Sequence, residues 1–138
     1  MGAIVLGYDD SPGARNALAT ALDLANRFGD KLVVAFGVAP PVSSVGEEWS
    51  AHKAAVEEIG RRATATALEQ AREAGVEAEV ALVPERPSAA LVTLAEENDA
   101  RFIVVGSYGE GPIKGAILGS TPHKLLHMSE RPVVVVPG

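Results

Sequence analysis

The segment Phe102 to Thr121, FIVVGSYGEGPIKGAILGST, combines residue types that can bind an anion. Four apolar residues at 102–105 predict a strand buried on both faces, and glycine follows at 106, 109, 111, 115 and 119. Glycine permits positive φ and close approach to the main chain, so several N–H groups can converge on one anion. Ser120 and Thr121 precede Pro122, which suits the first turn of a helix with its own free N–H groups. A phosphate is the expected occupant, although such a loop can also be an ordinary surface turn.

Apolar runs and helical patterns alternate along the whole chain and would position this loop. Strands are predicted at Ala3–Tyr8, Lys31–Val38, Val76–Val83, Phe102–Val105 and Val133–Val136. Helices are predicted from Pro12 to Gly29, from Glu47 to Ala74, from Pro87 to Asn98 and from Thr121 to Met128. Five strands separated by helices imply right-handed crossovers and a parallel sheet. No internal repeat or boundary divides residues 1–138, so we expect one α/β domain.

Helical spacing also predicts which faces are buried. In the first helix the apolar stripe comprises Ala14, Leu18, Ala21, Leu22, Ala25 and Phe28. In the second helix it comprises Val56, Ile59, Ala63, Ala67 and Ala71, with Gly60 marking a weak point or close packing. The alternation of apolar and acidic residues from Val76 predicts a half-exposed strand near a sheet edge.

Composition excludes several classes of protein. The net charge of −6 and the lack of a basic run argue against nucleic-acid binding. No apolar segment reaches the roughly 18 residues of a membrane span, and the N-terminus lacks the pattern of a signal peptide, so we expect a cytoplasmic protein without membrane contact. The chain has no cysteine, which excludes disulfides, thiolate zinc sites and a cysteine nucleophile.

The glycine spacing resembles that of a known family. Gly106, two residues, Gly109, nine residues and then Gly119-Ser120 is similar to the loop of the universal stress protein family, in its ATP-binding branch. The resemblance extends from IVLGYDDSPGARNAL at the start to RPVVVVPG at the end, and it identifies residues 1–138 as one universal stress protein domain. It implies a doubly wound, Rossmann-like fold of the adenine nucleotide alpha hydrolase type, with strand order 3-2-1-4-5 and helices on both faces. The carboxyl ends of strands one and four would then lie side by side, where open α/β sheets bind ligands.

The resemblance also assigns nucleotide contacts to individual residues. The expected binding residues are Tyr8, Asp9, Val38, Gly106, Gly109, Gly119, Ser120 and Thr121. In this assignment the loop glycines, Ser120 and Thr121 supply phosphate and ribose donors, Asp9 accepts from ribose, and the main chain at Val38 meets adenine. The alternatives are a loop that keeps its shape without binding, a Val38 that only packs in the core, and an Asp10 that only favours the following helix.

Some residues depart from the usual family pattern. Glu110 stands where a basic residue is common, and Tyr108 replaces a histidine or arginine. Arg101 replaces a frequent aspartate, and Glu85-Arg86 lacks a common glycine before Pro87. These departures bear on the expected affinity for the nucleotide more than on the expected fold. His123 and His127 are four residues apart on a predicted helix, but no obvious third ligand supports a metal site.

The expected function is an adenine-nucleotide-binding regulatory module for the stress response. Its ligand would be ATP, ADP or AMP, with Mg²⁺ accompanying the phosphates. The apolar edge strand Val133 to Val136 predicts a homodimer, as the family commonly forms. A nucleotide-free dimeric scaffold and a slow ATP hydrolase are the alternatives. Efficient turnover is not expected, because the chain lacks G-x-x-x-x-G-K-[ST] and an evident catalytic set, so no catalytic residue is assigned.

Overall fold

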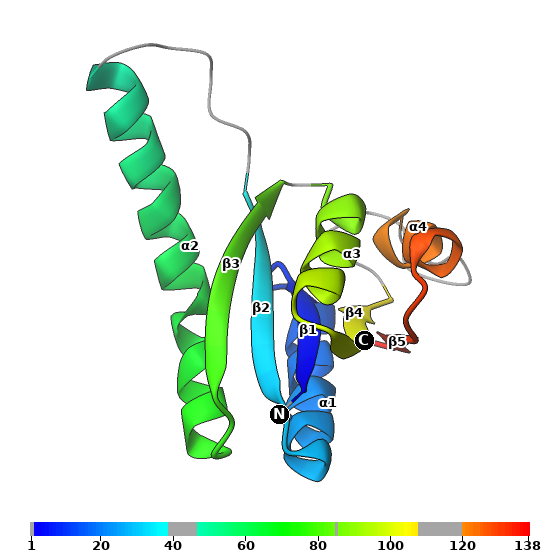
Figure 1. Ribbon diagram of the computed structural model, residues 1–138. Coiled ribbons are helices and arrows are strands. Elements are labelled where there is room, and N and C mark those ends of the chain that lie inside the picture. The colour runs from blue at the N-terminus through cyan, green and yellow to red at the C-terminus, as the bar shows by residue number, and fades with distance from the viewer. Residues whose placement is uncertain (1, 39–46, 85, 108–119) are drawn as a thin grey trace.

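The computed structural model describes residues 2–38, 47–84, 86–107 and 120–138, without the side chains of residues 47–50 and 52. Its strands form one five-stranded sheet in the order β3-β2-β1-β4-β5, with every neighbouring pair parallel (Figure 1). The strands are β1 (Ala3–Tyr8), β2 (Lys31–Val38), β3 (Ala78–Pro84), β4 (Ala100–Gly106) and β5 (Val133–Val136). The helices are α1 (Pro12–Phe28), α2 (Glu47–Glu73), α3 (Ser88–Glu97) and α4 (Ser120–Met128). The predicted α/β architecture and strand order are confirmed.

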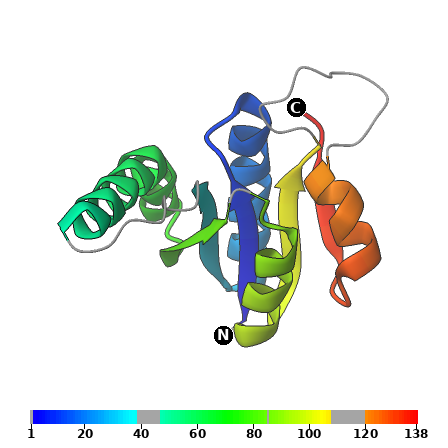
Figure 2. The ribbon, with the colours of Figure 1, turned by 90° about the horizontal axis from the view of Figure 1, so that it is seen from above.

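Helices cover both faces of the sheet, as the view from above shows (Figure 2). One apolar cluster joins α1 and the second half of α2 to residues such as Ile4, Leu6 and Val34. The other joins Leu91 of α3 and Leu125 of α4 to the opposite faces of the same strands. Because the central strands are buried on both sides, their sequences are continuously apolar rather than alternating.

The start and stop signals of α1 act as the sequence indicates. The Oγ of Ser11 accepts a hydrogen bond from the amide of Ala14 at 3.2 Å, and Pro12 occupies the first turn. Gly29 ends the helix in the left-handed conformation with φ of 68°. The buried stripe differs from the prediction at its last member, because Phe28 is 46% exposed. Its ring instead lies against Phe102 and beneath the guanidinium of Arg101.

The buried face of α2 agrees with the predicted stripe at Ala67 and Ala71 but not at Ile59. Ile59 is 60% exposed, whereas Gly60 and Thr64 are buried together with Ala67 and Ala71. A Cβ on Gly60 would lie 2.7 Å from Leu82 Cδ2, so the missing side chain allows the helix to approach β3. The Thr64 hydroxyl can be buried because it donates to the Gly60 carbonyl at 2.7 Å. The helix therefore packs against β3 through Gly60, and the apolar side chain of Ile59 remains exposed.

Element boundaries differ by small amounts from the predicted ones. The third strand begins at Ala78 rather than Val76, because the amide of Val76 bonds to the Ala71 carbonyl and completes the end of α2. Pro84 is the last residue of this strand, a position where its missing N–H is tolerated. The predicted edge location of the strand is confirmed.

A buried carboxylate organises the amino edge of the sheet. The Asp30 side chain is 1% exposed, and its Oδ2 accepts from Arg101 Nε at 2.8 Å. Its Oδ1 accepts from the amide of Gly2 at 3.1 Å. Arg101, which departs from the family pattern, thus joins the start of β4 to the turn before β2.

Replacing Asp30 tests this link. We expect Asp30→Ala to lower the free energy of unfolding by about 1–3 kcal/mol, because it removes the charged acceptor of the partly buried hydrogen bonds from Arg101 and the Gly2 amide. Urea denaturation measures the change. Asp23→Ala is the matched control, since its pair with Arg27 is exposed and should contribute less than about 1 kcal/mol. Equal losses in the two variants would contradict the role assigned to Asp30.

Candidate functional site

The carboxyl ends of β1 and β4 lie next to each other, since these two strands pair directly. Gly106 ends β4 in close contact with the start of α1. A Cβ at this position would lie 3.0 Å from both the carbonyl carbon and oxygen of Gly13, so only glycine fits without moving backbone. The resemblance predicted that the segments carrying Asp9 and Gly106 meet at this edge, and the strand pairing agrees with it.

Asp9 follows β1 directly, and its side chain is held by the start of α1. Its Oδ1 accepts from both the amide and the hydroxyl of Ser11, the amide at 3.0 Å. Within the described residues Oδ2 has no hydrogen-bond donor, and Asp9 is exposed. One carboxylate oxygen is therefore fixed while the other remains able to accept from a ligand.

Asp10 has a different environment, although it is adjacent in sequence. Its backbone has a left-handed φ of 60°, and its Oδ1 accepts from Tyr8 Oη at 2.8 Å and from Arg15 Nε at 3.3 Å. Burial, with the neighbouring Asp10 carboxylate, raises the pKa of Tyr8 to about 12. Tyr8 is 3% exposed, so its side chain orients Asp10 within the turn rather than presenting a free hydroxyl.

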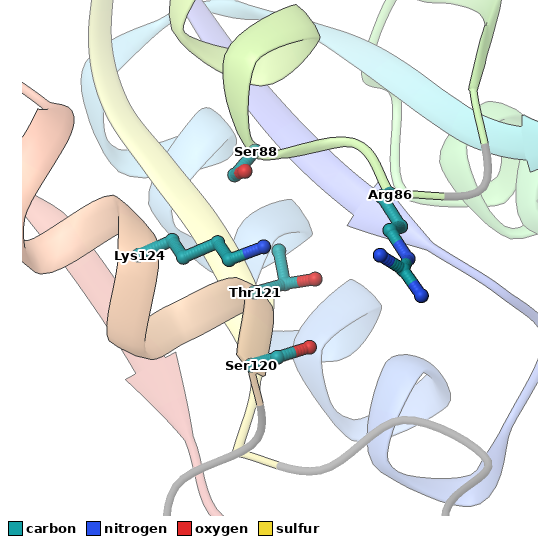
Figure 3. Close-up of a pocket in the computed structure, with 5 residues that line it drawn as sticks. All are labelled: Arg86, Ser88, Ser120, Thr121 and Lys124. Carbon is teal, nitrogen blue, oxygen red and sulfur yellow. The ribbon is translucent and has the colours of Figure 1, made fainter.

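The start of α4 faces the start of α3 across a pocket of about 330 Å³ (Figure 3). Ser120 and Thr121 line it from the first turn of α4, and Lys124 from the next turn. Ser88, the first residue of α3, and Arg86 line it from the other side. Both helix N-termini contribute the positive ends of their dipoles, so the pocket suits a negatively charged group.

The remaining predicted contacts have varied outcomes. Val38 ends β2, pairs with Pro84 and packs partly against the core, which leaves both of its interpretations open. Gly109 and Gly119 lie outside the described residues, as do Tyr108, Glu110 and Lys114. The structure thus brings Asp9, Gly106, Ser120 and Thr121 to one edge of the sheet and leaves the intervening glycine loop untested.

The two histidines of α4 contact each other. The rings of His123 and His127 are 5.1 Å apart between centroids, in an edge-to-face arrangement. Among the described residues, no group of three histidine, aspartate or glutamate side chains could hold a metal ion.

No helix within the described ranges is long and apolar enough to span a membrane.

Sequence reasoning missed three of the residues that line the pocket, two opposite α4 and one on α4 itself. Arg86 was noted only as a departure from the family pattern, and Ser88 and Lys124 were not considered. A signal was present, since Arg86 and Ser88 flank Pro87 at a predicted helix start, and such starts face the carboxyl edge of a parallel sheet. Their convergence with α4 depends on the packing of α3 against α4 beside β4.

Comparisons with known proteins agree with this fold. The model of the universal stress protein family matches residues 1–137. A universal stress protein of Mycolicibacterium smegmatis is 33% identical over 138 residues, covering 96% of this chain and 45% of that protein. One from Thermus aquaticus is 34% identical over 137 residues and covers 96% of both chains. A solved universal stress protein in complex with cAMP is 30% identical, with a TM-score of 0.70 over 98% of this chain and 96% of its own. The chain spans about half the length of the first curated relatives it matches.

The raised pKa of Tyr8 predicts a pH dependence of stability. The folded protein favours the neutral phenol, so this contribution is present below pH 10 and is lost as pH rises toward 12. Across that interval the free energy of unfolding should fall faster in the wild type than in Tyr8→Phe, by at most about 1.4 kcal/mol per pH unit. Denaturant titrations at several pH values measure both slopes. Identical slopes would show that the hydroxyl is not held as described.

Proposed function

Because the chain belongs to the universal stress protein family, we propose that it is an adenine-nucleotide-binding regulatory module of the stress response. The nucleotide, ATP or its relatives ADP and AMP, binds at the carboxyl ends of β1 and β4. Its phosphates are held by the segment Gly106-x2-Gly109-x9-Gly119-Ser120 and by Thr121, and Mg²⁺ accompanies them. The module acts in the cytoplasm, in agreement with the absence of cysteine.

The observation that carries this proposal is the pocket at the start of α4. Ser120 and Thr121 offer hydroxyls and first-turn amides there, beside the cationic side chains of Arg86 and Lys124. A net charge of −6 does not attract anions in general, so a cationic pocket at the expected ligand edge is informative. The solved relative in complex with cAMP supports an adenine nucleotide as the ligand class.

The two carboxylates after β1 differ in how they would meet this nucleotide. Asp9 keeps one oxygen bound to Ser11 and the other without a donor among the described residues, so it can accept from a ribose hydroxyl. Asp10 is occupied by Tyr8 and Arg15. We assign the nucleoside contact to Asp9 and a local structural role to Asp10.

We further propose that the module is a homodimer that pairs along β5. The amides of Ile103 and Ser107 donate to the carbonyls of Pro132 and Val136, so those carbonyls face β4. Since backbone groups alternate in direction along a strand, the N–H and C=O groups of Val133 and Val135 face away from the sheet. A twofold mate would pair with these groups and cover an apolar edge.

Calorimetric titration with a matched pair of variants tests nucleotide binding. Nucleotide-stripped wild-type protein should bind ATP or AMP with a dissociation constant near the micromolar range, about −8 kcal/mol. Asp9→Asn should weaken binding about tenfold, because it removes a charged acceptor for ribose, whereas Asp10→Asn should have a small effect. Absence of binding to ATP, ADP, AMP and cAMP in the folded wild type would favour the scaffold alternative instead.

A backbone substitution tests the dimer. Val135→Pro removes an outward N–H without breaking the bonds to β4, so it should favour monomers of 14.3 kDa in light scattering. Val135→Ala shortens the side chain comparably but keeps the N–H, and should remain mainly dimeric. A monomeric wild type, or a Val135→Pro variant that dimerises equally well, would contradict pairing through β5.

A further inference from the structure

The pocket between α3 and α4 has a charge pattern that is unusual for this protein. Arg86 and Lys124 approach it from different elements, and Thr121 lies between their ends in the close-up view (Figure 3). The other lining residues are Ser88 and Ser120, so the described lining holds two cations, three hydroxyls and no carboxylate. Such a lining suits an anion with several oxygen atoms.

Arg86 differs from the other arginines of the described structure, each of which has a carboxylate partner. These paired residues are Arg15, Arg27, Arg61, Arg62, Arg72, Arg101 and Arg131. Within the described residues neither Arg86 nor Lys124 lies within ion-pair distance of an acidic side chain. In a chain with more acidic than basic residues, two such cations at one pocket point to an anionic ligand.

Ser88 gives an independent indication of a ligand. It is only 8% exposed, yet no described residue forms a hydrogen bond with its hydroxyl, which lines the pocket. Its Oγ borders the pocket with its hydrogen-bonding capacity unused by the described residues, so it can bond to a group bound there. The pocket volume, about 330 Å³, also lies within the range of small-molecule sites.

We infer that Arg86 and Lys124 bind the terminal phosphates of the nucleotide and make the site selective for ATP and ADP over AMP and cAMP. The inference rests on the proposed function, which places the phosphate chain at Ser120 and Thr121 among other residues, and it adds that the first phosphate lies at these two. Further phosphates of the same chain then extend along the pocket toward the two cations. Arginine offers a planar fork to phosphate oxygens and lysine a point charge, and a nucleotide with one phosphate gains little from either.

The test compares nucleotides that differ only in phosphate number. ATP, ADP and AMP, with cAMP in parallel, are titrated into nucleotide-stripped protein at fixed ionic strength with excess Mg²⁺. Wild-type protein should bind ATP at least about tenfold more tightly than AMP. The double variant Arg86→Gln, Lys124→Gln should lose about tenfold or more in ATP affinity while its AMP affinity changes less than about twofold.

A second double variant controls for net charge. Arg27→Gln, Lys31→Gln removes the same charge at the amino edge of the sheet, where β2 begins, and should keep the preference for ATP. If AMP binds to the wild type but ATP binds no more tightly, the inference fails while the proposed function stands. Equal losses of ATP and AMP affinity in the pocket variant would also overturn it. Failure of ATP, ADP, AMP and also cAMP to bind would overturn both proposals, and binding of cAMP as tight as that of ATP would overturn the inference alone.

Discussion

The close contact between the end of β4 and the start of α1 is the constraint on which the candidate site depends. Gly106 lies so near the backbone of Gly13 that a Cβ here would be 3.0 Å from its carbonyl, a tight contact that the backbone would have to relieve by a small shift. This contact places the first turn of α1, and the Asp9–Ser11 turn before it, beside the point where β4 ends. The following amide, at Ser107, is tied to Val136, so the exit from β4 is fixed on both sides. A ligand at this edge would meet backbone already held by packing rather than by the ligand.

A buried carboxylate is paired at one edge of the sheet, whereas two cations at the other edge lack an acidic partner among the described residues. At the amino edge the buried carboxylate of Asp30 is neutralised by Arg101 and the Gly2 amide, which closes the fold. At the carboxyl edge Arg86 and Lys124 have no such partner among the described residues. In a parallel α/β sheet the helix N-termini lie at this edge. The side chains of Arg86 and Lys124 add positive charge to the helix dipoles there. The Asp30–Arg101 ion pair and the proposed nucleotide site therefore lie at opposite ends of the strands.

Much of the fold follows from the sequence because its signals are local. Continuous apolar runs, Ser11-Pro12 and Gly29 identify the elements of the first βα unit without tertiary information. The predicted stripe of α2 was confirmed at Ala67 and Ala71 and wrong at Ile59, because periodicity favours an apolar side chain whereas the helix approaches Leu82 through Gly60. The Asp30–Arg101 pair joins residues 71 positions apart, and the pocket joins the starts of α3 and α4. The helix start at Pro87 indicated the edge at which Arg86 lies, but single-sequence patterns do not show that Arg86 and Lys124 line one pocket. The positions of Asp9, Gly106 and Ser120 at the carboxyl edge were predictable, and their contacts with a nucleotide stay a prediction.

The most direct test of the account is to map ATP binding by nuclear magnetic resonance on isotope-labelled protein. If the nucleotide binds between β1, β4 and α4, the largest amide shifts should fall on Asp9, Ser120 and Thr121, together with residues around Arg86, at the carboxyl edge. The amides of Asp30 and Arg101, at the opposite edge, should change little. Unchanged spectra at millimolar ATP, or shifts confined to the amino edge or to α2, would contradict the placement of a nucleotide site between β1, β4 and α4.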